Sequence, residues 1–251
     1  MTIRWEWTHD QHLLWARLNR PKANILDREM VTALETGLRE RVKPDTFALV
    51  LSHEGPHFSF GASVQEHVKD QVAGMLSHFH GLFRTLDALS IPLLACVKGQ
   101  CLGGGFELAS FCHFIFAHPE ARMGQPEIQL GVFPPMGSLL LPLRLPALAD
   151  RLNLTGESLS AAQIQPFGLI TELSTDPELA AVHFFEKHLA SLSASSLRLT
   201  TWATRWPIRQ ALAQTLPVLE THYLESLMNT QDANEGLDAF LAKRPVVWRH
   251  A

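Results

Sequence analysis

The chain contains few cysteines, and their spacing excludes two classes of protein. Of 251 residues only Cys96, Cys101 and Cys112 are cysteine, and no two of them form a C-x-x-C pair. An odd number without paired spacing argues against a small disulfide-stabilised scaffold. We therefore expect buried, reduced thiols and a cytoplasmic location.

Long apolar runs and an excess of one charge are also absent. The segment from Met1 to Leu14 is too polar for a signal peptide. Glycine, proline, histidine or charged residues interrupt the apolar runs well before they reach the length of a membrane span. Charged residues make up 18% of the chain and the formal net charge is −4, without the basic stripe of a nucleic-acid-binding protein. We expect neither a membrane nor a nucleic acid as partner.

The 13 histidines show no H-E-x-x-H or comparable ligand spacing. The sequence therefore predicts no metal site.

Hydrophobic residues, at 46%, suffice for a sizeable core, and the length permits a core domain with a smaller appendage. Short apolar runs alternate with helical patterns, which indicates an α/β layered fold. The expected strands are a pair within 5–18 and runs at 47–52, 91–97 and 114–117; the expected helices follow Asp27 and cover 64–89, with an interruption near Gly74, and 106–112. We predict a core at 1–194 and a helical region at 195–251.

The segment from Gly99 to Ala109 places three glycines directly before an apolar helix. Glycines let a backbone approach a ligand closely, and the N–H groups at a helix start favour negative charge. Glu107 lies in the first turn of that helix, where apolar neighbours can raise its pKa for acid–base chemistry. The alternative is a turn built for tight packing. The pattern does not match a phosphate-binding loop.

A second carboxylate follows a rigid turn. Pro126 precedes Glu127, and Gly131 with the Pro134–Pro135 pair continues the irregular backbone. Glu127 is thus a further acid–base candidate, and its alternative is a solvated turn residue.

The loop from Gly55 to Ser63 joins an expected strand to an expected helix, and its small residues allow a backbone N–H near Phe60 to face a ligand. His57 and Ser59 suggest a hydrolase, but no G-x-S-x-G sequence accompanies them. A polar loop is the favoured interpretation of both.

These segments together resemble the crotonase superfamily, the enoyl-CoA hydratase/isomerase group. The resemblance covers nearly the whole chain and rests on segments in the family's order and spacing: 18–23, 58–62, 103–109, 124–131, 154–157, 168–170 and 236–244. It implies a spiral of ββα units and a C-terminal helical region that builds a homotrimer or a dimer of trimers. It also implies an enzyme, a hydro-lyase acting on acyl-CoA, with no cofactor because CoA is part of the substrate.

The resemblance further implies roles for single residues. By position, the backbone N–H groups of Phe60 and Gly104 form an oxyanion hole for the thioester oxygen. Glu107 and Glu127, 20 positions apart, divide the proton work, with Glu107 expected as the base towards water and Glu127 as the acid towards the α-carbon. For CoA, the loops containing Arg20, Lys22, Ala23 and Phe58 are expected contacts, as are Phe240 and Lys243. The alternative for the lysines is solvated surface.

Three departures from a generic fatty-acid hydratase narrow the choice of acyl group in the substrate. Ser63 stands where an aspartate is common, Gly99–Leu102 precedes the glycines, and Gly131–Ser138 replaces a glycine-rich loop. All three resemble those family members that hydrate a cyclic dienoyl thioester, which gives Phe133, Pro135 and Met136 the role of shaping a ring-sized pocket. Open alternatives are a linear enoyl-CoA hydratase, an isomerase, dehalogenase or hydrolase on the same scaffold, and a non-catalytic acyl-CoA-binding subunit.

Overall fold

A six-stranded sheet forms the centre of the computed structural model, which describes residues 1–251. The strand order is β1-β2-β3-β4-β6-β9; β1 and β2 are antiparallel and the other pairs are parallel. Its strands are β1 (Ile3–Thr8), β2 (Leu13–Leu18), β3 (Ala48–His53), β4 (Leu93–Val97), β6 (Phe114–Ala117) and β9 (Glu172–Leu173). Strands β3 and β4 are buried almost throughout, as expected for parallel strands covered on both faces.

A second, three-stranded sheet carries the turns that lead to the site. Strand β5 (Gln100–Leu102) pairs in parallel with β7 (Arg122–Gly124), which pairs antiparallel with β8 (Ser158–Ser160). The segment after β5 contains Glu107 and the segment after β7 contains Glu127. Because the two strands are parallel neighbours, the segments that carry the two glutamates both begin at the same end of this sheet.

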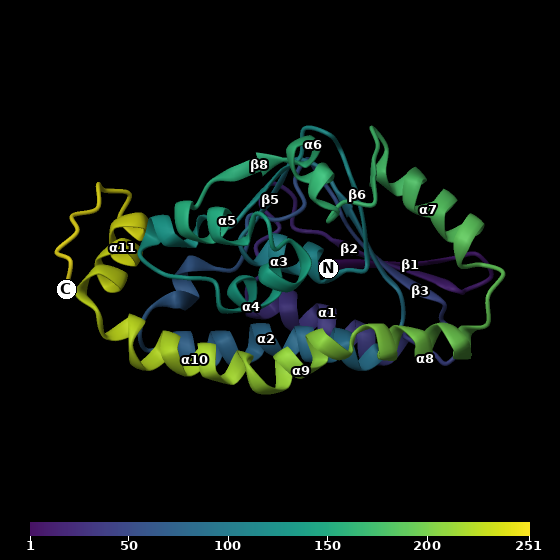
Figure 1. The fold of residues 1–251 in the computed structure, drawn as a ribbon, viewed down its shortest axis with the longest axis horizontal. Helices are drawn as coiled ribbons and strands as arrows, with labels where there is room; N and C mark the ends of the chain where they lie inside the picture. Colours follow the sequence, from purple (N-terminus) through teal and green to yellow (C-terminus); the bar gives the residue numbers. More distant parts are fainter.

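Helices cover both sheets (Figure 1). The helices before residue 194 are α1 (Arg28–Arg41), α2 (Val72–Leu89), α3 (Gly104–Phe111), α4 (Pro135–Arg144), α5 (Ala149–Thr155), α6 (Ala161–Ile164) and α7 (Pro177–His188), with short 3-10 turns η1 (Val64–His67), η2 (Pro126–Leu130) and η3 (Gln165–Phe167). Asp27 caps α1 as predicted, because its side chain accepts a hydrogen bond from the N–H of Met30.

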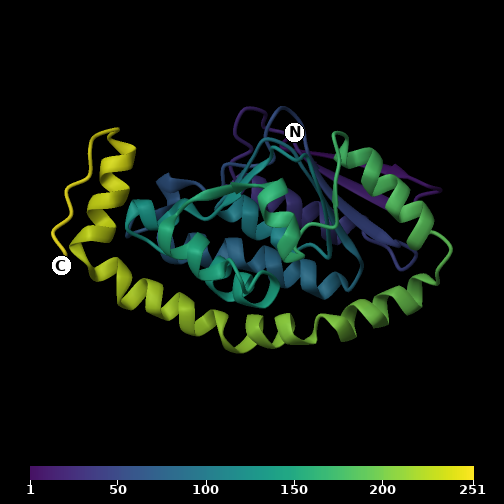
Figure 2. The same ribbon diagram turned by 45° about the horizontal axis from the view of Figure 1, so that its top comes forward.

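The C-terminal part is helical, as expected. It contains α8 (Ala194–Thr204), α9 (Trp206–Gln214), α10 (Leu216–Glu225), the turn η4 (Leu227–Asn229) and α11 (Gln231–Leu241). Helices α8 to α10 run along one side of the molecule and α11 turns back at its end (Figures 1 and 2). Leu212, Leu216 and Leu237 join the same hydrophobic cluster as the sheet. The division at 194/195 stays a prediction.

Two sequence expectations need correction. The helix expected at 64–89 is interrupted at Val68–Gln71 and not at Gly74, because Val68 is extended and residues 69–71 are exposed, whereas Gly74 lies inside α2. The loop expected at 99–105 contains β5, since a strand signal of three residues beside glycines is too short to recognise.

No helix in the chain combines the length and apolar character needed to cross a membrane.

Candidate active site

Glu107 is anchored between two helix starts. It lies in the first turn of α3, is 4% exposed, and its Oε1 accepts a hydrogen bond of 2.5 Å from the N–H of Gly137 near the start of α4. Burial raises the pKa of Glu107 well above its usual value, and the charge of Glu127 raises it further. The Glu107 carboxyl therefore holds a proton more readily than a solvated glutamate.

Glu127 lies on the 3-10 turn η2, and its carboxylate rests against Gly103. Gly103 has φ of 52°, and a methyl group there would lie 2.5 Å from Glu127 Oε1; only glycine combines this backbone with this close approach. When the amide of Gln125 is assigned by its hydrogen-bond network, Nε2 donates to Glu127 Oε2 at 3.2 Å. Burial raises the pKa of Glu127 to about 7.

The two carboxyls border one small inner cavity of about 30 Å³. Apart from them, its walls are mostly apolar and come from α2 and the segment that leads into α4: Met75, Leu76, Phe79, Val132, Phe133, Pro134 and Pro135. An adjoining outer cavity of about 70 Å³ shares Ala62, His67, Glu127 and Val132 with the inner one. The outer cavity includes Leu237, so α11 borders the site of its own chain.

Two free backbone amides lie beside the carboxyls, but one of them is not the amide expected from the sequence. The N–H of Phe60 donates to the carbonyl of Ala23 at 2.9 Å, so the predicted oxyanion-hole role of Phe60 is wrong. The N–H groups of Ala62 and Gly104 donate to no group in the chain. A methyl group on Gly104 would lie 3.2 Å from the Ala62 nitrogen, so the two amides are neighbours. Phe60 and Ala62 are only two positions apart, so sequence spacing could not tell which of their amides is free. The geometry of the loop decides it.

The residues expected to shape a ring pocket separate into two groups. Phe133 and Pro135 border the inner cavity. Met136 does not: its side chain is completely buried in the main hydrophobic cluster, because α4 turns it away from the cavity and into the core. The prediction for Met136 is therefore wrong.

The residues expected to contact CoA do not form one cluster. Ala23 and Phe60 are joined by a backbone hydrogen bond, Lys22 is exposed without an ion pair, and the side chain of Phe58 is completely buried. Arg20 pairs with Asp27 and Glu29, so its charge is already balanced. Phe240 and Lys243 are exposed at the end of α11, with no hydrogen bond or ion pair to the Lys22 loop.

His57 and Ser59 have structural roles. His57 Nδ1 accepts a hydrogen bond from the N–H of Gln100, and Ser59 Oγ donates to the carbonyl of Asn24. These bonds tie together the loops that carry Ala62 and Gly104. They support the polar-loop interpretation over a hydrolase dyad.

Sequence reasoning missed several groups at the site. His67 and His80 border the inner cavity. Tyr223 of α10 is buried, its hydroxyl has no hydrogen-bond partner, and burial together with the charge of Glu127 raises its pKa. His80 could have been noticed as a lone histidine beside Leu76, Phe79 and Phe83 on the apolar face of a helix, whereas Tyr223 reaches the site only through the fold.

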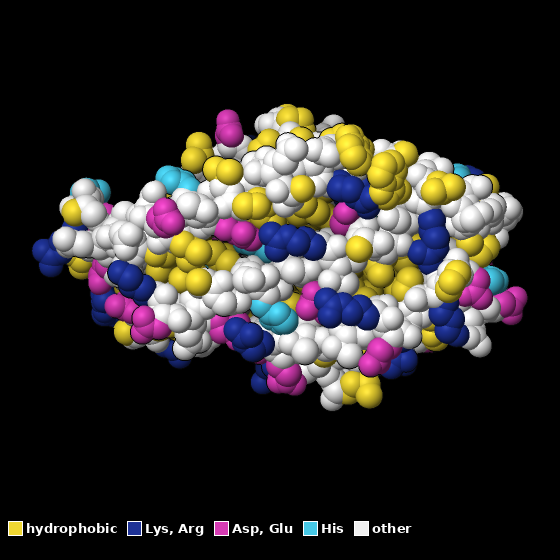
Figure 3. All heavy atoms as spheres, turned by 90° about the horizontal axis from the view of Figure 1, so that it is seen from below, with side chains coloured by type: hydrophobic (Ala, Val, Ile, Leu, Met, Phe, Trp, Pro, Cys, Tyr) yellow, Lys and Arg dark blue, Asp and Glu magenta, His cyan; other side chains and the backbone are white.

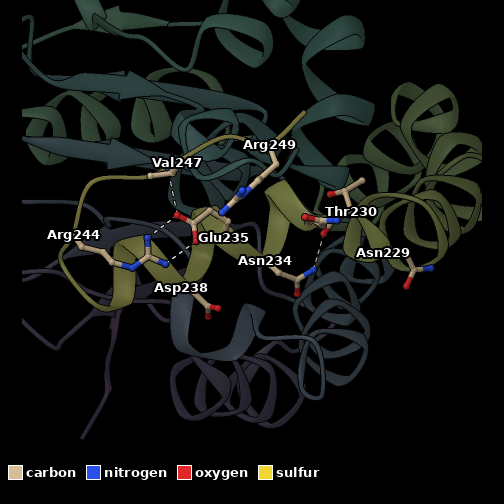
Figure 4. A pocket seen from close by; sticks show the side chains of 9 residues that line it. Asn229, Thr230, Asn234, Glu235, Asp238, Arg244, Val247 and Arg249 are labelled. Atoms are coloured by element: carbon tan, nitrogen blue, oxygen red, sulfur yellow. Dashed lines mark hydrogen bonds and ion pairs between the residues drawn. The ribbon is translucent and has the colours of Figure 1, made fainter. Parts of the chain in front are cut away.

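A larger hollow than the cavity at the two glutamates lies elsewhere. It has about 700 Å³, lies beside α11, and contains a Glu235–Arg244 ion pair but none of the predicted site residues (Figure 4). Its walls are almost entirely polar and open, unlike the enclosed apolar walls around the two glutamates. Nowhere do three or more His, Cys, Asp or Glu side chains gather in a way that could hold a metal ion.

Comparison with known proteins identifies the family to which the chain belongs. The profile of the Enoyl-CoA hydratase/isomerase family matches residues 8–251. The chain belongs to this family. It is 48% identical to the cyclohexa-1,5-dienecarbonyl-CoA hydratase of Thauera aromatica over 96% of this chain and 94% of that protein. It is 32% identical to the 2,3-dehydroadipyl-CoA hydratase of Escherichia coli, over 94% of this chain and 95% of the relative.

Solved structures agree with the family assignment. An enoyl-CoA hydratase from Mycobacterium avium superposes with a TM-score of 0.86 at 26% identity, covering 98% of each chain. The predicted crotonase-type fold is thus confirmed. As a family member, the chain is an enzyme of the hydratase type, a hydro-lyase.

Proposed function

We propose that the chain adds water to an α,β-unsaturated acyl-CoA thioester, with Glu107 and Glu127 moving the protons. The observation that carries this proposal is a buried carboxyl, Glu107, and a half-buried one, Glu127, on one cavity beside two free backbone amides. Hydration needs a base for the water and an acid for the α-carbon in the same turnover. Two coupled carboxyls with raised pKa values can hold one proton between them at neutral pH and so provide both.

The amides of Ala62 and Gly104 are proposed as the oxyanion hole. The thioester oxygen gains negative charge when water attacks the double bond, and neighbouring N–H donors stabilise that charge. Each donor of this kind contributes about 3–4 kcal/mol in the transition state.

The division of labour between the carboxyls is open to test. The expectation from the sequence makes Glu107 the base. Burial raises the pKa of both carboxyls, so either of them can carry the proton that the pair shares.

For the acyl group we propose cyclohexa-1,5-diene-1-carbonyl-CoA. Two observations support a ring: the identity to the Thauera aromatica hydratase and the apolar inner wall that includes Phe133 and Pro135. We propose exposed Lys22 and Lys243 as partners of the CoA phosphates, with Phe240 near the adenine or pantetheine.

The chain is further proposed to form a homotrimer or a dimer of trimers through its C-terminal helices. Exposed Leu199, Trp202, Trp206 and Val218 lie on α8 to α10, on the side of the molecule where Figure 3 shows apolar patches between charged groups.

The test is a chromatographic assay with cyclohexa-1,5-diene-1-carbonyl-CoA and crotonyl-CoA, run beside a Glu107→Gln variant. Hydration of the diene, lost in the variant, is the expected result. Hydration of crotonyl-CoA alone would keep the mechanism and overturn the ring assignment. Binding of both thioesters without reaction would overturn the hydratase proposal and favour an acyl-CoA-binding subunit.

A further inference from the structure

His80 is a polar group in an otherwise apolar wall. It lies on α2 and is 1% exposed, and the other α2 residues that border the inner cavity are Met75, Leu76 and Phe79. Its Nδ1 lies 2.6 Å from Glu220 Oε1 on α10. Glu220 also accepts a bond from Arg84 at 3.4 Å on its outer side.

The contact with Glu220 decides which ring nitrogen carries the proton. The carboxylate accepts, so Nδ1–H donates, and the neutral ring then presents the lone pair of Nε2. Burial, the largest influence, lowers the pKa of His80 and favours this neutral form. The tautomer of His67, which borders the same cavity, is fixed in the same way, because the carbonyl of Ser63 accepts a hydrogen bond from its Nδ1–H.

Nε2 of His80 has no hydrogen-bond partner in the chain. An imidazole nitrogen without a proton is a hydrogen-bond acceptor. A molecule in the cavity that donates a hydrogen bond can therefore pair with Nε2 of His80, which borders that cavity together with both glutamates.

We infer that His80, oriented by Glu220, is a third active-site contact that accepts a hydrogen bond from the reacting water and, after addition, from the new hydroxyl group of the product. The inference rests on the proposed hydratase function. In this role His80 takes up no proton; it orients the water between the two carboxyls, and Glu220 is the residue that positions His80.

Kinetics provide the first test. His80→Phe keeps a ring of similar shape but no acceptor, so kcat is expected to fall about 10- to 100-fold with KM changed less than about threefold. His80→Gln, whose amide oxygen can accept the same bond, is expected to recover part of kcat. His78→Gln is the matched control, because His78 lies two positions earlier on α2 and bonds Thr32 on the surface. Wild-type kcat in a folded His80→Phe variant would overturn the inference.

A second test does not depend on turnover or on whether a variant folds. Nitrogen-15 NMR of the wild-type imidazoles is recorded with 3-hydroxybutyryl-CoA and with butyryl-CoA, which differ only in the hydroxyl group. The His80 Nε2 signal is expected to move with the hydroxyacyl thioester and to stay in place with butyryl-CoA. Equal responses to the two ligands would overturn the inference. A wild-type enzyme that hydrates no thioester would instead overturn the proposed function, and the NMR comparison would still decide whether His80 contacts the hydroxyl.

Discussion

Helix α3 and turn η2 each carry one of the two glutamates, but the rest of the molecule holds these segments differently. All eight residues of α3 are buried, so Glu107 is fixed from every side by the core. No residue of η2 is buried. Glu127 lies instead against Gln125 and Gly103, and the end of η2 packs against α11 and the C-terminal tail.

The tail contact is specific. The indole of Trp248 would lie 3.1 Å from a methyl group on Gly131 and 3.0 Å from one on Gly236. Trp248 thus covers the point where the end of η2 meets α11. The core thus places the carboxyl of Glu107, whereas peripheral contacts place that of Glu127. Changes far from the chemistry should therefore affect Glu127 more than Glu107.

Removing either carboxyl should have the largest effect. Glu107→Gln and Glu127→Gln are each expected to lower kcat for thioester hydration by about 10²–10⁴-fold, the usual contribution of a general acid or base. Steady-state kinetics measure this, with circular dichroism to check folding. A variant that kept more than a tenth of wild-type kcat would remove its glutamate from the proposed mechanism.

Displacing Glu127 without removing it should come next. Gly103→Ala places a methyl group 2.5 Å from Glu127 Oε1 at a positive φ, and we expect kcat to fall about 100-fold, close to the loss from removing a general acid or base. Gly168→Ala is the matched control, because Gly168 also has a positive φ, of 82°, but nothing lies within 4 Å of the added methyl group. Equal losses of activity in the two variants would assign the effect to backbone strain.

The raised pKa of Glu127 should make stability depend on pH. Between its usual value of 4.5 and about 7, the folded chain binds more protons than the unfolded chain, so stability falls as pH rises through this window. The Glu127→Gln variant has no ionisable group at this position, so it does not lose stability in this way as pH rises. We expect the variant to be more stable than wild type by about 1–3 kcal/mol at pH 8, with the difference smallest near pH 4.5. Urea unfolding at both pH values measures it, and parallel wild-type and variant curves would contradict the assignment.

Loosening the tail should have the smallest effect. Trp248→Ala removes the contact with Gly131 and Gly236, and we expect kcat to fall by roughly 3- to 10-fold because a misplaced general acid or base loses only part of its contribution. Val247→Ala, at an exposed neighbouring position, is the control and should keep wild-type kcat. If Trp248→Ala also left kcat unchanged, η2 would not depend on the tail.

Much of the fold could be predicted from local patterns. Buried strands such as Ala48–His53 and Leu93–Val97 appear in the sequence as continuous apolar runs, and Asp27 as a helix cap. Strand β5 could not be predicted, because its three residues depend on pairing with β7. The break before α2 was misplaced, since glycine at position 74 is tolerated within the helix.

The sequence by itself determined the family, the two glutamates and the glycines beside them, because these depend on residue type and spacing along the chain. Only the tertiary structure decided that Ala62 rather than Phe60 presents a free amide, that Met136 turns into the core, and that His80 meets Glu220 across 140 positions. The physical reason is that hydrogen-bond partners and burial are properties of neighbours in space, and the neighbours of these residues come from distant segments.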